Sequence, residues 1–170
     1  MSIECVIANP AWNEHDPETL VLDCLEATSQ EIGPPALARA ATVLFTDDEA
    51  VQKLNLEWRG KDRPTNVLSF PAEPMPGLPA DMQPLGDVAL ALETCEREAQ
   101  EKKIPFCHHA AHLVVHGLLH LCGYDHVADA DAEAMERAER HILQRLGIDD
   151  PYGDTPEHIE CGASEEGPAP

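Results

Sequence analysis

The segment HGLLHLCGYDH, residues 116–126, constrains the fold of this 170-residue chain more than any other. His116 and His120 stand four positions apart, so a helix places both imidazoles on one face, about 40° and about 6 Å from each other. Gly123 permits the left-handed backbone that ends a helix, and the chain beyond it can bring His126 back to the same point. The sequence therefore predicts a helix, a sharp turn and three converging imidazoles.

This spacing follows the zinc-peptidase pattern H-E-x-x-H-x-x-G-x-x-H, but Gly117 stands where the pattern has its catalytic glutamate. Three neutral imidazoles leave a cation with its full charge and an open coordination position, which is typical of catalytic zinc sites. We predict one zinc ion per chain, and nickel or another divalent metal is also compatible with such nitrogens. The alternative interpretation is a histidine-rich helix face whose rings bond to backbone carbonyls.

The ligand set has one ambiguity, because His112 and His116 form as good an i,i+4 pair as His116 and His120. The turn after the helix brings His126 toward the helix end, which favours His120. His112 is then one turn too distant, and we expect it in the core or hydrogen-bonded to a ligand. Cys122 points about 200° away from His120 on a helix, so we expect it to pack rather than to bind metal.

The remaining sequence alternates β-branched apolar runs with helical patterns in the order βαβαββααα. Strands are expected at 3–8, 41–47, 66–70 and 86–92. Helices are expected at 16–33, after Asp47 or Asp48, and at 93–103, 107–122 and 129–146. The predicted class is α/β (α+β), with a small mixed sheet flanked by helices and a zincin-like metal-binding helix.

Two segments have further expected features. Val51, Leu54 and Trp58 should face inward from the helix that follows Asp47. Residues 71–84 contain five of the fifteen prolines and should form a loop long enough to act as a flap.

Length and a 43% hydrophobic content indicate one domain, expected at 1–152, followed by an acidic, disordered tail at 153–170. No apolar run approaches the ~20 residues of a membrane span, so we expect a soluble, cytoplasmic protein without a membrane partner. The six cysteines include no C-x-x-C pair, which favours buried thiols in a reducing compartment over disulfides.

The net charge of −21 argues against general affinity for nucleic acid, but the basic residues are unevenly placed. Four of the eleven lie between 53 and 63, namely Lys53, Arg59, Lys61 and Arg63. A local basic patch on an acidic body is therefore expected, with a solvated surface loop as the alternative interpretation.

The missing glutamate favours a phosphodiester substrate over a peptide. Peptide hydrolysis needs a general base on the helix, whereas a phosphodiester needs a Lewis acid and a cation for its developing charge. Arg59 is the expected catalytic cation, close to the open coordination position, and Lys61 and Arg63 are further candidates for binding the substrate. Asp125 and Asp87 could act as a base or support a metal ligand, and either could instead be a turn or capping residue.

Four stretches, RGKDRPTNVLSFP, LGDVAL, AHLVVHGLLHLCGYDH and GIDDPY, resemble the YbeY family of bacterial rRNA maturation factors. The resemblance runs from about residue 40 to 152 in the same order. It implies a single-strand-specific, metal-dependent endoribonuclease that acts in 16S rRNA 3′-end maturation, late ribosome quality control and ribosome biogenesis. The family's metal ligands fall on His116, His120 and His126, and its functional arginine falls on Arg59.

The resemblance also implies partners: single-stranded rRNA, the small ribosomal subunit, and a ribosomal or assembly-factor protein. A second class of function fits the same residues, in which a non-catalytic, metal-stabilised assembly factor binds the small subunit. A peptidase is disfavoured because Gly117 replaces the base.

Overall fold

The computed structural model describes residues 3–33 and 39–151, and its strands form one mixed sheet. The strands are β1 (Ile3–Ile7), β2 (Ala41–Thr46), β3 (Val67–Pro71) and β4 (Gly86–Ala91). The spatial order is β1-β2-β4-β3, with β1, β2 and β4 parallel and β3 antiparallel to β4. The predicted mixed sheet is confirmed, and β3 forms one of its edges.

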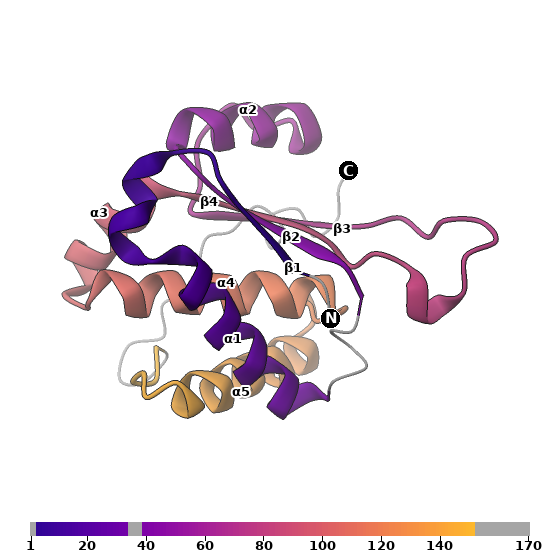
Figure 1. Ribbon diagram of the computed structural model, residues 1–170. Helices are drawn as coiled ribbons and strands as arrows, with labels where there is room; N and C mark the ends of the chain where they lie inside the picture. The colour runs from indigo at the N-terminus through magenta and orange to yellow at the C-terminus, as the bar shows by residue number, and fades with distance from the viewer. Residues whose placement is uncertain (1–2, 34–38, 152–170) are drawn as a thin grey trace.

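Helices cover the sheet unequally. They are α1 (Pro17–Ile32), α2 (Asp48–Arg59), α3 (Leu92–Lys102), α4 (Phe106–Leu121) and α5 (Asp129–Arg145), with 3₁₀ turns η1 (Pro10–His15) and η3 (Ala80–Met82). α1, α4 and α5 lie on one side of the sheet and α2 lies on the other (Figure 1). The predicted order βαβαββααα is confirmed, and the element boundaries differ from the expected ones by no more than one residue.

Alternating strand residues divide the interior into two clusters. The larger lies between the sheet and α1, α4 and α5, and includes Val67, Val88 and Leu90. The smaller lies under α2, where Val51 packs with Leu68 and Ala91. Among the described elements, α2 is therefore the helix that covers this side of the sheet, and it covers only part of it.

Trp58 does not face inward as expected. Val51 is buried and Leu54 is half-buried, but the Trp58 side chain is 65% exposed. The small cluster under α2 offers the indole only the half-buried Phe70 ring, 6.3 Å away between centroids, which leaves most of the side chain in solvent. Trp58 instead lies at the wall of a pocket.

The described thiols are free, as expected, but not all are buried. Cys24 and Cys95 are buried, Cys5 and Cys122 are half-buried, and Cys107 is exposed. Burial raises the pKa of Cys122 to about 11, which is consistent with a packing role. Among the described residues, no helix is long and apolar enough to cross a membrane. The predicted tail at 153–170 lies outside the described residues.

Gly117 is required by the close approach of α4 to the sheet. A Cβ at this position would lie 2.7 Å from Val88 Cγ1 and 3.3 Å from Ser69 Oγ. Val88 and Ser69 are both fully buried, so neither can easily give way. A glutamate at position 117 has no room, which explains why the zinc-peptidase base is missing.

We expect Gly117→Ala to destabilise the protein by about 1–2 kcal/mol, although alanine has the higher helix propensity. The reason is that the added Cβ would overlap with the Val88 side chain. Val88→Ala removes that overlap, so the destabilisation of the double mutant should be smaller, by at least about 1 kcal/mol, than the sum of the destabilisations of the two single variants. Urea unfolding of the four proteins measures this coupling. A Gly117→Ala variant more stable than wild type would contradict the packing argument.

Candidate metal centre

Three histidines bring their ring nitrogens together at the C-terminal end of α4. His116 and His120 are buried on that helix, and His126 follows the turn after it. Ring centroids are 4.6 Å apart for His116–His120, 5.3 Å for His120–His126 and 5.6 Å for His116–His126. One ring nitrogen of each lies within 4.8 Å of those of the other two, so the group could hold a metal ion.

The turn that returns His126 has the predicted left-handed glycine. Gly123 has a φ of +97°, and its N–H donates to the His120 carbonyl at 3.0 Å. The N–H of Tyr124 donates to the Leu119 carbonyl, also at 3.0 Å, so the last turn of α4 is closed by two bonds. The N–H of His126 then donates to Asp125 Oδ1 at 2.7 Å. These bonds fix the loop without occupying the His126 ring.

A buried carboxylate from α5 orients the histidines. His116 Nδ1 lies 2.5 Å from Glu139 Oε1, and His112 Nε2 lies 3.0 Å from Glu139 Oε2. With Nδ1–H donating to the carboxylate, the Nε2 lone pair of His116 points to the other two rings. Burial alone would raise the pKa of Glu139, but the charge of His116 and the hydrogen bonds from both imidazoles lower it. Glu139 is therefore ionised although it is fully buried.

Glu139 was missed by the sequence reasoning, although the pattern contains a signal. Met135 and Ile142 are buried on α5, and Glu139 stands four residues after one and three before the other. It thus occupies the inward stripe of an amphipathic helix, where an unpaired carboxylate would be costly. A glutamate in such a stripe predicts a cationic or metal-linked partner.

The donor set fits a divalent cation. Nε2 of His126 is buried and has no hydrogen-bond partner among the described residues. Nε2 of His116 and Nε2 of His120 lie 3.1 Å apart, where a shared cation would satisfy both lone pairs. Imidazole nitrogens suit zinc, nickel and related ions. His112 is outside this group, because its ring is held by Glu139 and lies 6.5 Å from the His116 ring.

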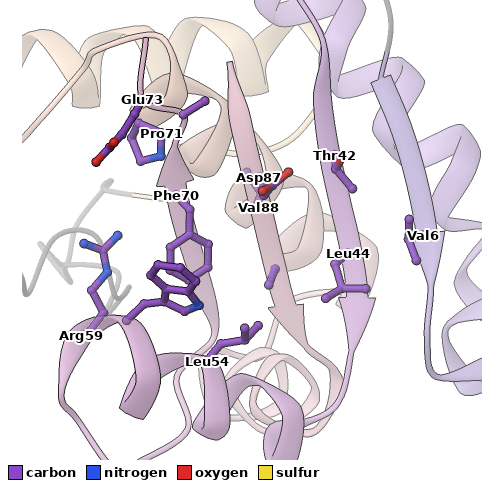
Figure 2. Close-up of a pocket in the computed structure, with 13 residues that line it drawn as sticks. Val6, Thr42, Leu44, Leu54, Arg59, Phe70, Pro71, Glu73, Asp87 and Val88 are labelled. Carbon is purple, nitrogen blue, oxygen red and sulfur yellow. The ribbon is translucent and has the colours of Figure 1, made fainter. Parts of the chain in front are cut away.

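Arg59 is tied to the edge strand β3, and its role toward a substrate stays a prediction. Its Nη2 donates to the Ser69 carbonyl at 2.6 Å, and its Cζ lies 5.2 Å from the Phe70 ring centroid. It lines a pocket of about 870 Å³ on the α2 side of the sheet (Figure 2), which none of the three histidines lines. Arg59 is therefore placed at the edge strand β3, on the other face of the sheet from α4.

Asp87 also lies on the α2 side. It is directly opposite Phe70 in the β3–β4 register and lines the same pocket as Arg59. Because its neighbour Val88 faces α4, the alternation of the strand turns Asp87 away from the histidines. Asp87 was a candidate either to support a metal ligand or to fill a turn or capping role, and among the described residues it makes no hydrogen bond to a histidine.

The other expected site residues lie in loops. Asp125 is exposed and its carboxylate accepts the His126 N–H, which is the turn role considered above. Lys61 and Arg63 follow α2, where Asn55 binds their backbones: it accepts from the Lys61 N–H at 3.2 Å and donates to the Arg63 carbonyl at 2.9 Å. Neither lines the Arg59 pocket, and their roles toward a substrate stay predictions.

Comparison with known proteins identifies the family. The family model described as Endoribonuclease YbeY matches residues 5–147. The chain belongs to this family. An endoribonuclease YbeY from Methylocella silvestris is 48% identical over 170 residues, covering 98% of this chain and 94% of the relative. Another from Rhizobium meliloti is 55% identical over 126 residues, covering 73% and 74%.

A solved structure supports the fold. The solution structure of TM1509 from Thermotoga maritima matches with a TM-score of 0.55 and 24% identity, covering 85% of this chain and 91% of that one. At this identity the match shows the architecture alone. It supports the arrangement of mixed sheet and flanking helices in which the histidines are placed.

We expect Glu139→Gln to weaken metal binding about 10- to 100-fold, because the variant loses the negative charge that orients His116 and makes it more basic. A competitive zinc titration against a chromogenic chelator measures the change. Glu133→Gln, an exposed position on the same helix, is the matched control and should bind zinc like wild type. Equal zinc affinity for the two variants would show that Glu139 does not support the site.

Proposed function

We propose that this protein is a zinc-dependent endoribonuclease that cleaves single-stranded rRNA in the cytoplasm. Its process would be 16S rRNA 3′-end maturation, with roles in ribosome biogenesis and late ribosome quality control. Family membership supports the reaction class. The observation that supports the metal-dependent part is the convergence of three ring nitrogens, where the buried Nε2 of His126 has no partner within the part of the chain that the structure describes.

The chain's own residues define the centre. Glu139 fixes the tautomer of His116, and His116, His120 and His126 would hold the cation through ring nitrogens. A divalent cation held there supplies Lewis-acid chemistry, which withdraws charge from a phosphate and makes a nearby water more acidic. Asp125, exposed beside His126, is the candidate to accept a proton. Gly117 leaves no carboxylate on the helix to protonate a leaving amine, which disfavours a peptide.

Arg59 would bind the phosphate backbone of the RNA. Its Nε is buried without a hydrogen-bond partner in residues 3–33 and 39–151, while Nη2 donates to the Ser69 carbonyl. This contact pins the guanidinium to the edge of β3 in a fixed orientation, which suits recognition of phosphate oxygens. Ser69 also lies against Gly117, which adjoins His116 in α4. The arginine and the helix that carries His116 thus both adjoin Ser69 of the edge strand, and we expect a single RNA strand to contact both.

We expect His116→Ala to lose zinc and RNA cleavage together, and Arg59→Ala to keep zinc but lose cleavage by on the order of 100-fold or more. Metal analysis and cleavage of a single-stranded 16S 3′-end fragment, with and without chelator, measure both properties. Lys53→Ala, which removes an exposed cation from the same helix, should cleave like wild type. Cleavage that survives chelation in the wild-type protein would refute the metal-dependent reaction.

The second candidate is a non-catalytic assembly factor that binds the small ribosomal subunit, with a ribosomal or assembly-factor protein as a further partner. Arg59 lines a pocket that none of the three histidines lines, which supports this candidate because binding RNA does not require an arginine beside the metal. Cells lacking the gene distinguish the two classes. Full rescue of rRNA processing by a cleavage-deficient variant that retains zinc would favour binding over chemistry.

A further inference from the structure

We propose that the pocket on the α2 side of the sheet binds one unpaired nucleobase of the RNA, whose exocyclic amino group is accepted by Asp87. This inference deepens the proposed function and rests on it for the choice of RNA as ligand. The pocket's volume of about 870 Å³ lies within the range of small-molecule sites and is ample for a base and its ribose.

Strand register gives the pocket an apolar floor beside a polar row. Ala89, Leu44 and Val6 are paired across β4, β2 and β1, so they lie side by side on the α2 face. Asp87 pairs with Thr42 across β4 and β2, and both lie two residues along their strands from the floor residues Ala89 and Leu44; Phe70 of β3 is paired with Asp87 on its other side. Figure 2 shows the Asp87 carboxylate between Phe70 and Thr42. An apolar floor next to hydrogen-bonding groups fits the face and edge of a base.

Two aromatic rings form the wall at the α2 end. The ring centroids of Trp58 and Phe70 are 6.3 Å apart with an interplanar angle of 58°. Trp58 lines the pocket although its side chain is 65% exposed, so its indole face is available to a ligand. Exposed aromatic side chains are the usual stacking surface for unpaired bases, and an adjacent arginine adds charge for the backbone.

The charges in the pocket set the direction of the nucleotide. Arg59 is the pocket's cation, while Asp87 and Glu73 are both exposed carboxylates that would repel a phosphate. The phosphate would therefore lie at Arg59 and the base would point toward Asp87. Within the described residues, Asp87 makes no hydrogen bond or ion pair, so its oxygens can accept from a ligand. Cytosine carries an amino group that can donate to a carboxylate, whereas uracil has a carbonyl there.

The experiment compares binding of single-stranded oligo(C) and oligo(U) hexanucleotides to the full-length protein, with chelator present to prevent cleavage. We expect wild type to bind oligo(C) several-fold more tightly. Trp58→Ala should weaken oligo(C) binding on the order of tenfold, whereas Leu56→Ala, which truncates another exposed residue of α2 outside the pocket, should not. Asp87→Asn should bring the oligo(C)-to-oligo(U) affinity ratio close to one.

Fluorescence locates the contact. The chain has two tryptophans, and Trp12 is fully buried, so quenching by RNA reports on Trp58. Trp58→Phe should keep most of the affinity and lose most of the quenching. Equal affinity for Trp58→Ala and Leu56→Ala, or an unchanged base ratio in Asp87→Asn, would overturn the inference. So would binding of cytidine monophosphate as tight as that of the hexanucleotide, which would indicate a site for free nucleotides.

Cleavage assays separate this inference from the proposed function. If these binding changes appear but wild type does not cleave RNA with metal present, the base pocket stands and the nuclease function falls. If wild type cleaves and Trp58→Ala binds and cleaves like Leu56→Ala, the nuclease function stands and the base pocket falls.

Discussion

The close packing of α4 against the sheet at Gly117 is the constraint on which the metal centre depends. Because Val88 and Ser69 leave no space for a side chain there, α4 is held at a fixed depth and rotation. That rotation directs His116 and His120 toward the turn after the helix. The same contact excludes a glutamate at position 117, so the geometry that builds a zinc-peptidase-like histidine site also prevents peptidase chemistry in it.

Glu139 makes this arrangement depend on charge as well as on packing. A fully buried carboxylate is costly unless it is paired, and its two oxygens are taken by His112 and His116. The pairing explains why His112 lies on the helix face next to the three converging histidines without joining them. It also joins α5 to α4. The orientation of His116 therefore depends partly on α5, a helix that follows the whole histidine motif in the sequence.

Local features of the site could be predicted from the sequence, but the face of the sheet on which a side chain lies could not. Helical spacing and a glycine turn predicted the converging histidines, because both are properties of consecutive residues. The role of Asp87 was left open between supporting a metal ligand and a turn or capping role, because which face a strand residue occupies depends on register with partners far along the chain. Trp58 lies on the apolar stripe of α2, so the sequence predicted it to be buried. It is exposed because the cluster under α2 is small, and the size of that cluster depends on how the sheet is assembled. The role of Glu139 could not be predicted without knowing that α5 packs against α4.

The histidine centre and the α2-side pocket would have different functions in recognising a single strand. A metal centre of three imidazoles has no means of telling a single strand from a duplex, because both present the same phosphates. A base that enters the α2-side pocket must be unpaired, and the cytosine amino group offered to Asp87 is the one that pairs with guanine in a duplex. Binding there competes with base pairing, so strand selectivity would come from this pocket and not from the cleavage centre. The net charge of −21 leads to the same conclusion, because so acidic a chain obtains little binding free energy from contacts with phosphates alone.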